Sequence, residues 1–248
     1  MLWPLGTTDF SLPDQEAHVW AASLDLPQVE LNQLESTLSQ EERERAARFR
    51  FRLHRNRFTA GRGLWRTILG QYLKMDPGKV VFNYGPHGKP SLGETTKNLH
   101  FNLAHSEDLA LIAVALGGPI GVDVERIRIL DDFDELVSRF FSSRETAVFR
   151  NLAPNQQPAA FFNLWTRKEA WLKATGEGIG YSLNRVEVTF LPGEPARLLS
   201  LPQNSSRLSN WTLHELSPAS GFASAVVISG ENVRLRCQCC PELSLLLA

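Results

Sequence analysis

The spacing of hydrophobic residues divides this chain into helical and extended stretches. Successive residues of an α-helix turn by about 100°, and apolar residues recur at that spacing from Phe51 to Tyr72 and from Phe161 to Leu172. Short apolar runs bounded by glycine, proline and asparagine predict strands elsewhere. These runs lie at 18–23, 80–92, 99–127, 185–201, 210–217 and 221–229. The pattern predicts an α+β protein.

The first helical region carries a start signal. Ser39 precedes Glu41 and Glu42, which is helix-capping chemistry with acidic residues in the first turn. The apolar spacing downstream indicates a long helix, or two helices broken near Ala60–Gly61, because glycine interrupts helical patterns. A second helical region begins near residue 131 and leads into the helix that contains Phe161.

Two pairs of segments look alike and suggest an internal duplication. LHFNLAHSEDLALIAVAL resembles NWTLHELSPASGFASAVVIS, and VVFNYGPHGKPSL resembles VEVTFLPGEPARLL. The members of each pair lie about 110 residues apart, and each follows a helical region. The repeat predicts two α+β halves, residues 1–117 and 118–248, with a ligand-binding cleft between them.

The second long helix carries charges where a core is expected. On helical geometry, Lys168 and Glu169 lie on or beside the apolar stripe that contains Trp165. An unpaired charge is costly there. Two interpretations stay open: a structural ion pair at the edge of the core, or a carboxylate that faces a cleft and holds a positive group.

The segment GVDVERI poses a similar question. Side chains of a strand alternate between faces, so Val122 and Val124 point into the core while Asp123 and Glu125 lie together on the other face. Like charges repel unless a cation lies between them. This face is either solvated, which is common in antiparallel sheets, or part of a binding site.

The three carboxylates Asp123, Glu125 and Glu169 suit Mg²⁺, which prefers oxygen ligands together with substrate phosphates. Cations for a phosphoanhydride substrate are also present. They are Lys168, Lys173, Lys89, Arg55, Arg57 and Arg62, and nine arginines lie between Arg43 and Arg66. The sequence contains neither a Walker A loop nor a Rossmann fingerprint.

The composition is that of a globular protein with a sizeable core. The chain has 248 residues and a net charge of −1, so nothing global points to nucleic acid or membrane. The start lacks a secretory signal, which predicts a cytoplasmic protein, and we expect a monomer. The crowded Cys237, Cys239 and Cys240 predict no disulfide framework, and the sequence near them offers no fourth zinc ligand.

Five segments in order resemble the Sfp-type 4'-phosphopantetheinyl transferases: AGRGLWR, HGKP, FNLAHS, GVDVE and WTRKEAWLKATGEG. The resemblance implies two pseudo-symmetric α+β halves with coenzyme A bound in the cleft between them. It implies transfer of the 4'-phosphopantetheine arm to a serine of an apo acyl carrier protein or peptidyl carrier domain. The other product is adenosine 3',5'-bisphosphate.

The resemblance also assigns residues. It implies that Asp123, Glu125 and Glu169 bind Mg²⁺, or Mn²⁺ in its place, and that Asp123 also borders coenzyme A. Lys173 matches a lysine that contacts the diphosphate, and Glu169 is the candidate base that accepts the serine proton.

The remaining matches concern the nucleotide. Arg57, Arg62 and His105 match residues near the adenosine 3'-phosphate, and Lys89 and Pro90 match the adenine site. Two positions depart from the family: Ala104 stands where serine is frequent, and His54 where some members have lysine. Both departures put contacts to the ligand in doubt.

The carrier-binding surface is less defined. Phe133, Phe140 and Phe141 lie near the family's docking region or belong to the core, and GEGIGYS is expected to shape part of the partner surface. Three alternatives remain: a silent module that binds coenzyme A or a carrier, a different magnesium-dependent phosphotransferase or phosphodiesterase, and a nucleic-acid-binding protein. Against the last, glutamates interleave the first arginines.

Overall fold

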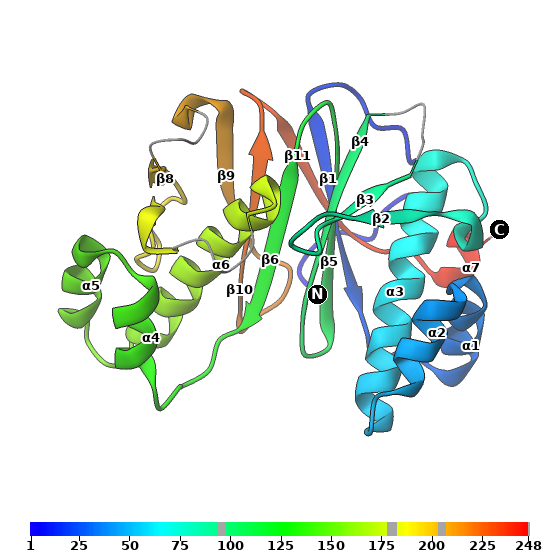
Figure 1. Cartoon of the computed structure of the whole chain (residues 1–248), viewed down its shortest axis with the longest axis horizontal. Helices are drawn as coiled ribbons and strands as arrows, with labels where there is room; N and C mark the ends of the chain where they lie inside the picture. Colours follow the sequence, from blue (N-terminus) through cyan, green and yellow to red (C-terminus); the bar gives the residue numbers. More distant parts are fainter. Residues whose placement is uncertain (94–97, 178–182, 203–206, 248) are drawn as a thin grey trace.

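The computed structural model describes residues 1–93, 98–177, 183–202 and 207–247 (Figure 1). Two main sheets lie side by side, one in the order β11-β1-β5-β4 and the other in the order β6-β10-β9. Two small hairpins, β2-β3 and β7-β8, accompany them. The strands are β1 Glu16–Ser23, β2 Phe82–Tyr84, β3 Pro90–Leu92, β4 Leu99–Ser106, β5 Leu109–Leu116, β6 Ile120–Arg126, β7 Glu187–Val188, β8 Leu198–Ser200, β9 Trp211–Leu216, β10 Phe222–Ser229 and β11 Arg234–Cys239.

Helices cover the outer faces of the two sheets (Figure 1). The α-helices are α1 Gln28–Thr37, α2 Gln40–Ala47, α3 Arg52–Leu73, α4 Phe133–Phe140, α5 Ser143–Arg150, α6 Gln157–Thr175 and α7 Leu243–Leu246. Short 3₁₀ helices span Pro77–Lys79, Leu183–Arg185 and Leu208–Asn210. Within the described residues, no helix is long and apolar enough to cross a membrane.

The two halves repeat one order of elements, which confirms the predicted duplication and the α+β class. In the first half a strand, three helices, a small hairpin and a larger hairpin follow one another, and the second half repeats this order from β6 to β10. The strand orders β1-β5-β4 and β6-β10-β9 correspond position by position. The similar sequence segments are therefore the equivalent hairpins β4-β5 and β9-β10, and β2-β3 and β7-β8.

The end of the chain returns to the first half. Strand β11 runs parallel to β1, with Val19 opposite Cys237. Beyond it, Leu243 and Leu246 of α7 join the core beneath α3. The division after residue 117 remains a prediction, but β11 and α7 complete the first sheet and its core. The three cysteines are free and lie on or directly after β11.

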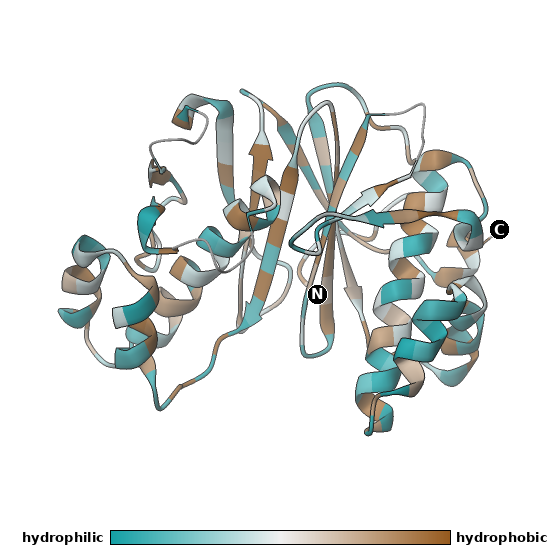
Figure 2. Ribbon diagram, in the orientation of Figure 1, coloured by the Kyte–Doolittle hydropathy of each residue, from teal (hydrophilic) through white to brown (hydrophobic). Residues whose placement is uncertain are grey.

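Three apolar clusters hold the layers together, and hydrophobic colour concentrates on the strands and on the inner sides of the helices (Figure 2). One packs α3 on the first sheet, and another packs α6 on the second sheet. The third contains Val19 and Leu111 from the first sheet and Val122 and Val226 from the second. This third cluster joins the two halves.

Helix α3 is continuous through Ala60 and Gly61, so the alternative of two broken helices is wrong. The glycine that matters is Gly63, where a Cβ atom would lie 2.5 Å from the Cβ of Leu34 on α1. Close approach of α1, rather than a break, explains glycine in this helix. The predicted cap at Ser39 is confirmed, since Ser39 and Glu42 form a reciprocal capping box.

A second close contact positions the functional strand. At Gly121 on β6, a Cβ atom would lie 2.1 Å from the carbonyl oxygen of Ala170 on α6. Only glycine lets the helix lie this near the strand. Because side chains two apart share a face, Asp123 points to the same side as Gly121, toward the C-terminal half of α6.

Candidate active site between the halves

Strand β6 presents apolar and acidic side chains on opposite faces, as its alternation predicts. Val122 and Val124 are buried in the cluster between the two sheets. Asp123, on the other face, is only 5% exposed, so a solvated outer face is excluded for this residue. Its carboxylate lies against α6, where it meets Lys173.

Among the described residues, only one of the two carboxylate oxygens of Asp123 has a hydrogen-bond partner. Its Oδ1 accepts a hydrogen bond of 2.6 Å from Lys173 Nζ on α6, whereas its buried Oδ2 has no hydrogen-bond partner among the described residues. Burial raises the pKa of Asp123, and the charge of Lys173 opposes this shift. A buried carboxylate with a free oxygen is costly unless a ligand completes it.

Glu169 is also 5% exposed, and its buried Oε1 lacks a partner within the described chain. Burial, and then the negative charge of Asp123, raise the pKa of Glu169 to about 7, while Lys173 lowers it. Glu125 makes a smaller contribution in the same direction as Asp123. Of the two interpretations left open for Glu169, the structure supports a carboxylate that faces a cleft.

Glu125 lies one step further along β6 and is half-buried. Its Oε2 accepts a hydrogen bond of 2.8 Å from Ser106 Oγ on β4. Burial raises the pKa of Glu125, and the charge of Asp123 adds to the effect. The charge of Asp123 thus disfavours ionisation of both Glu125 and Glu169, in addition to the larger effect of burial.

These residues fit a divalent cation in chemistry. All the candidate ligand atoms are oxygens, and two of them have no hydrogen-bond partner in the described part of the chain. The described residues contain no group of three or more His, Cys, Asp or Glu side chains already arranged to hold a metal ion. Magnesium binding by Asp123, Glu125 and Glu169 thus remains a prediction.

Lys168 has a different role from the one considered for it. Its ammonium donates to Glu145 Oε2 at 2.5 Å and to the carbonyl of Leu183 at 3.0 Å, and its side chain is 1% exposed. Burial lowers the pKa of Lys168, and Glu145 opposes this. Lys168 forms a buried structural ion pair with Glu145, so its ammonium is not available to bind phosphate.

A cavity of about 360 Å³ adjoins Glu169 and Lys173 and is walled by both halves. Its lining is His87, Gly88, Lys89, Pro90, Asn102, Leu103, Glu169, Leu172, Lys173, Gly176 and Glu177. A second cavity of about 310 Å³ shares His87, Lys89, Pro90 and Gly176 with the first. The structure thus places Lys89, Pro90, Lys173 and Glu169 around one continuous cleft.

Lys89 links the cleft walls. Its Nζ donates to the carbonyl of Ala174 at 2.5 Å, near the C-terminal end of α6, where a cation interacts favourably with the helix dipole. Burial lowers the pKa of Lys89 to about 8. Gly176 then ends the helix with a left-handed conformation, φ +80°.

His105 lies near the exposed end of β4. Loss of hydration and the charge of Lys173 lower its pKa, and Asp123 raises it. These influences place His105 in the surroundings of the acidic group. Ala104 is buried, so its side chain adds no hydrogen bond to the site.

The basic residues of α3 are engaged elsewhere. Arg57 forms two hydrogen bonds to Asp25, at 2.7 and 2.8 Å. Arg62 pairs with Glu42 at 2.6 Å and bonds to the hydroxyl of Tyr84. Neither arginine lines the two cavities of the cleft, so their contact with the 3'-phosphate stays a prediction.

The candidate carrier-docking residues are three phenylalanines of the second half and the segment GEGIGYS. Phe141 is 3% exposed in the second core, and Phe133 and Phe140 pack against that core. Phe141 therefore belongs to the core, whereas Phe133 and Phe140 are partly exposed at its edge and their part in carrier docking stays a prediction. Most of GEGIGYS, residues 178–182, lies outside the described residues.

The sequence did not single out three side chains of the site. Asn102 Oδ1 accepts from the backbone N–H of Val122, and Ser106 accepts from that of Arg126, which ties β4 to β6. Glu177 lines the cleft, its buried Oε2 has no hydrogen-bond partner among residues 1–93, 98–177, 183–202 and 207–247, and burial raises its pKa. The polar residues of the segment FNLAHS are the feature of the sequence from which Asn102 and Ser106 could have been predicted.

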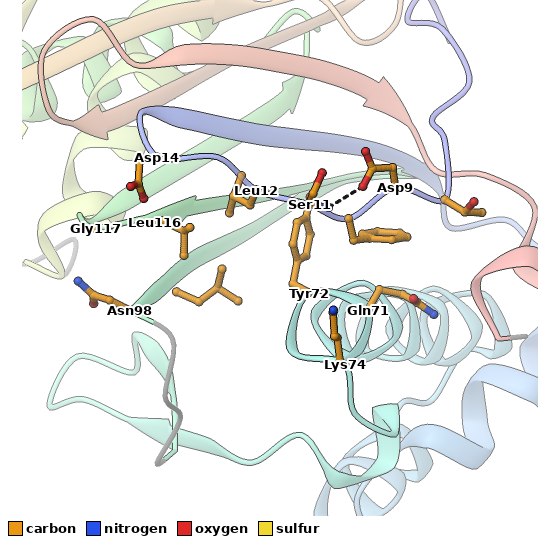
Figure 3. Close-up of a pocket in the computed structure, with 13 residues that line it drawn as sticks. Asp9, Ser11, Leu12, Asp14, Gln71, Tyr72, Lys74, Asn98, Leu116 and Gly117 are labelled. Atoms are coloured by element: carbon orange, nitrogen blue, oxygen red, sulfur yellow. Dashed lines mark hydrogen bonds between the residues drawn. The ribbon is translucent and has the colours of Figure 1, made fainter.

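A larger cavity of about 720 Å³ lies in the first half, beneath the N-terminal segment (Figure 3). There Asp9 accepts from the backbone N–H of Ser11, and the Tyr72 hydroxyl accepts from Trp20 Nε1. Asp9 and Tyr72 of this cavity are thus hydrogen-bonded within the protein. It contains none of the three carboxylates, so the smaller cleft is the candidate active site.

Comparisons with known proteins match both halves. The 4'-phosphopantetheinyl transferase superfamily matches residues 119–227, and the N-terminal 4'-phosphopantetheinyl transferase family matches residues 22–116. The chain is 44% identical over 230 residues to the 4'-phosphopantetheinyl transferase HetI of Nostoc sp., covering 92% of this chain and 94% of the relative. It is 29% identical over 163 residues to the 4'-phosphopantetheinyl transferase Sfp of Bacillus subtilis, and the match covers 66% of this chain and 71% of the relative.

Among solved structures, one match is a holo-(acyl-carrier-protein) synthase from Bacillus anthracis in complex with CoA (3',5'-ADP). It is 25% identical and covers 46% of this chain and 96% of that one, with a TM-score of 0.37.

Proposed function

Because the chain belongs to the 4'-phosphopantetheinyl transferases, we propose that it moves the 4'-phosphopantetheine arm of coenzyme A onto a serine of an apo acyl or peptidyl carrier protein. The observation that carries the proposal is a pair of buried oxygens on Asp123 and Glu169, beside Lys173, for which the described part of the chain offers no hydrogen-bond partner. Glu169 and Lys173 line a cleft walled by both halves. A silent binding module has no need of such a costly arrangement.

In this proposal Asp123, Glu125 and Glu169 hold the metal. A bound Mg²⁺ ion supplies positive charge to the diphosphate oxygens, which lowers the cost of charge that develops during transfer. Burial raises the pKa of each of the three carboxylates, and the charge of Asp123 adds to the shift of Glu125 and Glu169. A bound cation would offset both effects.

Lys173 contributes a mobile cation. Its side chain is 30% exposed, and its ammonium donates to Asp123. Rotation about the long side chain can bring the ammonium to a diphosphate in the adjoining cavity, where it stabilises negative charge on the leaving group.

Glu169 is the proposed base. The serine oxygen of the carrier forms a bond to the phosphorus that bears pantetheine, and the bond from that phosphorus to the bridging oxygen breaks. The serine proton passes to Glu169, directly or through water, and adenosine 3',5'-bisphosphate leaves with the electron pair. Glu169 lines the cleft beside Lys173, which places a carboxylate where the attacking hydroxyl is expected.

Lys89 predicts a pH dependence of coenzyme A binding. Its pKa of about 8 means that it loses its charge as pH rises through 8, so the affinity for a polyanion falls. We expect KM for coenzyme A to rise above pH 8, by at most about tenfold per pH unit for a single proton. Steady-state kinetics from pH 7 to 9.5 measure this, with Lys89→Arg as the control because arginine stays charged. Identical pH profiles for both proteins would exclude Lys89 as the titrating cation.

The proposed reaction is tested by its nucleotide product. Chromatography should detect adenosine 3',5'-bisphosphate when the protein is incubated with coenzyme A, Mg²⁺ and an apo carrier, in equal amount to the modified carrier. A carrier whose reactive serine is replaced with alanine should give none. Release of the bisphosphate without a carrier would instead indicate a hydrolase.

A further inference from the structure

The two main sheets meet along two edge strands. Strand β4 ends the order β11-β1-β5-β4, and strand β6 begins the order β6-β10-β9. An edge strand has backbone N–H and C=O groups that its own sheet leaves unpaired, and such groups need partners where they are buried. On β6, the N–H groups of Val122 and Arg126 bond to side chains of β4. Side chains of the first half thus contact the open edge of the second.

These two side chains fix the register of the strands. Asn102 Oδ1 accepts from the N–H of Val122 at 2.9 Å, and Ser106 Oγ accepts from the N–H of Arg126 at 3.1 Å. Each bond joins residues that are 20 apart in the chain, so the strands run in the same direction with a constant offset. Two fixed points also position the part of β6 between them, and that part carries two of the three carboxylates.

Ser106 makes a further hydrogen bond, to a carboxylate. Its Oγ donates to Glu125 Oε2 at 2.8 Å. A hydroxyl has one proton, so the bond accepted from Arg126 places the oxygen and the donated bond sets the direction of the proton. The carboxylate of Glu125 is therefore held by a side chain of the first half, although its backbone belongs to the second.

Ser106 is itself well anchored. It pairs with Leu109 across the β4-β5 turn, and Leu109 is buried and also pairs with Ser23 of β1. Within the turn, the carbonyl of Asp108 accepts from the N–H of Leu24 at 2.7 Å. A side chain that orients another needs a support of this kind.

The bond to Glu125 differs in kind from the one that holds Asp123. Asp123 accepts from the ammonium of Lys173, a cation that competes with a metal ion for the same carboxylate. Glu125 accepts from a neutral hydroxyl. A neutral donor orients the carboxylate without cancelling its charge, and hydrogen bonds of this kind orient carboxylates that bind metals in proteins.

We infer that Ser106 is a positioning residue for the metal site. Its hydroxyl orients the carboxylate of Glu125 toward the cation, and the bond from Arg126 fixes that orientation across the junction of the two halves. The inference rests on the proposed function, in which Glu125 holds the metal. The first half then contributes to the metal site although it supplies none of the three carboxylates.

Removal of the hydroxyl tests the inference. We expect Ser106→Ala to raise the Kd for Mn²⁺ about tenfold, measured without coenzyme A from the electron paramagnetic resonance signal of free Mn²⁺. Ser106→Thr keeps the hydroxyl and should restore binding to within about threefold of wild type. In transfer assays, Ser106→Ala should need about tenfold more Mg²⁺ for its half-maximal rate, while kcat at saturating Mg²⁺ stays within about twofold of wild type.

The matched control is Ser224→Ala on β10. Ser224 Oγ donates to the carbonyl of Leu216 at 2.9 Å, so this variant also loses a hydroxyl bond between strands. The bond is directed to β9, on the side of β10 away from β6. Ser224→Ala should bind Mn²⁺ like the wild type. Circular dichroism and urea unfolding check that each variant is folded.

A double-mutant cycle separates the orientation of Glu125 from a general effect on the strand. If the hydroxyl acts through Glu125, Ser106→Ala should change the Kd for Mn²⁺ by less than about twofold when Glu125 is already alanine. An effect of about tenfold in both backgrounds would assign the loss to the position of β6 as a whole, and would overturn the role of the bond to Glu125.

The outcomes distinguish this inference from the proposed function. Wild-type affinity for Mn²⁺ in Ser106→Ala, or an equal loss in Ser224→Ala, with transfer intact, overturns the inference and leaves the transferase. The expected loss in Ser106→Ala, without transfer by the wild type to fatty-acid, polyketide or peptidyl carriers, supports the inference and overturns the transferase. Absence of Mn²⁺ binding by the wild type overturns both the inference and the metal-binding role of the carboxylates.

Discussion

Replacement of Glu169 with glutamine should abolish phosphopantetheine transfer and leave the fold intact. Glutamine has the same shape but neither carries negative charge nor accepts a proton, so metal binding and base function fail together. We expect kcat to fall by about a thousandfold or more, and Asp123→Asn to act similarly. Stopped assays with carrier and coenzyme A measure this, with Glu231→Gln at an exposed turn as the control. Turnover near the wild-type rate in either variant would contradict the assignment.

The same substitution has a predicted effect on stability. The folded-state pKa of Glu169 is raised from 4.5 to about 7, so the folded protein binds this proton more tightly than the unfolded chain. Its contribution is therefore present below pH 4.5 and is lost as pH rises to about 7, by up to about 3 kcal/mol. In chelator at pH 8, Glu169→Gln should be more stable than wild type in urea unfolding, and the difference should shrink toward pH 5.

Replacement of the neighbouring Lys168 with alanine should greatly lower the stability of the protein, unlike Glu169→Gln, which should raise it in chelator at pH 8. It leaves Glu145 buried, 3% exposed, without its cation, and breaking a buried pair in this way costs about 3–5 kcal/mol. Urea unfolding measures the change. A variant within about 1 kcal/mol of wild type would show that the Lys168–Glu145 pair is not structural.

Arg144→Ala is the control for that experiment. The Arg144 side chain is 73% exposed and lies 4.0 Å from Glu187, so its removal should change the free energy of unfolding little. The double variant Glu145→Gln/Lys168→Met should recover much of the stability lost in Lys168→Ala, because no charge is left buried and unpaired.

Local periodicity predicted what depends on local structure. The alternation of GVDVERI placed Val122 and Val124 in the core and Asp123 on the opposite face, as observed. It could not decide whether that face is solvated, and Asp123 is in fact buried. Helical spacing placed Lys168 and Glu169 on the buried stripe but could not separate their roles. The separation depends on Glu145, a partner 23 residues away in the chain, and no local pattern encodes that contact.

Long-range contacts account for the other differences. Helix α3 passes Gly61 unbroken, and Gly63 serves the approach of Leu34 from another helix. The partners of Arg57 and Arg62, Asp25 and Glu42, lie 32 and 20 residues away. The return of β11 to β1 joins the two ends of the chain. Each depends on tertiary packing, which a single sequence does not display.

The central claim, metal-dependent transfer by the cleft carboxylates, is tested most directly by the intact mass of a carrier protein. An apo acyl carrier protein is incubated with this protein, coenzyme A and Mg²⁺, beside an identical reaction with chelator. We predict a gain of about 340 Da, the mass of one phosphopantetheinyl group on serine, that is absent with chelator. A gain of equal size with chelator would contradict the metal site, and no gain on fatty-acid, polyketide or peptidyl carriers would contradict the transferase.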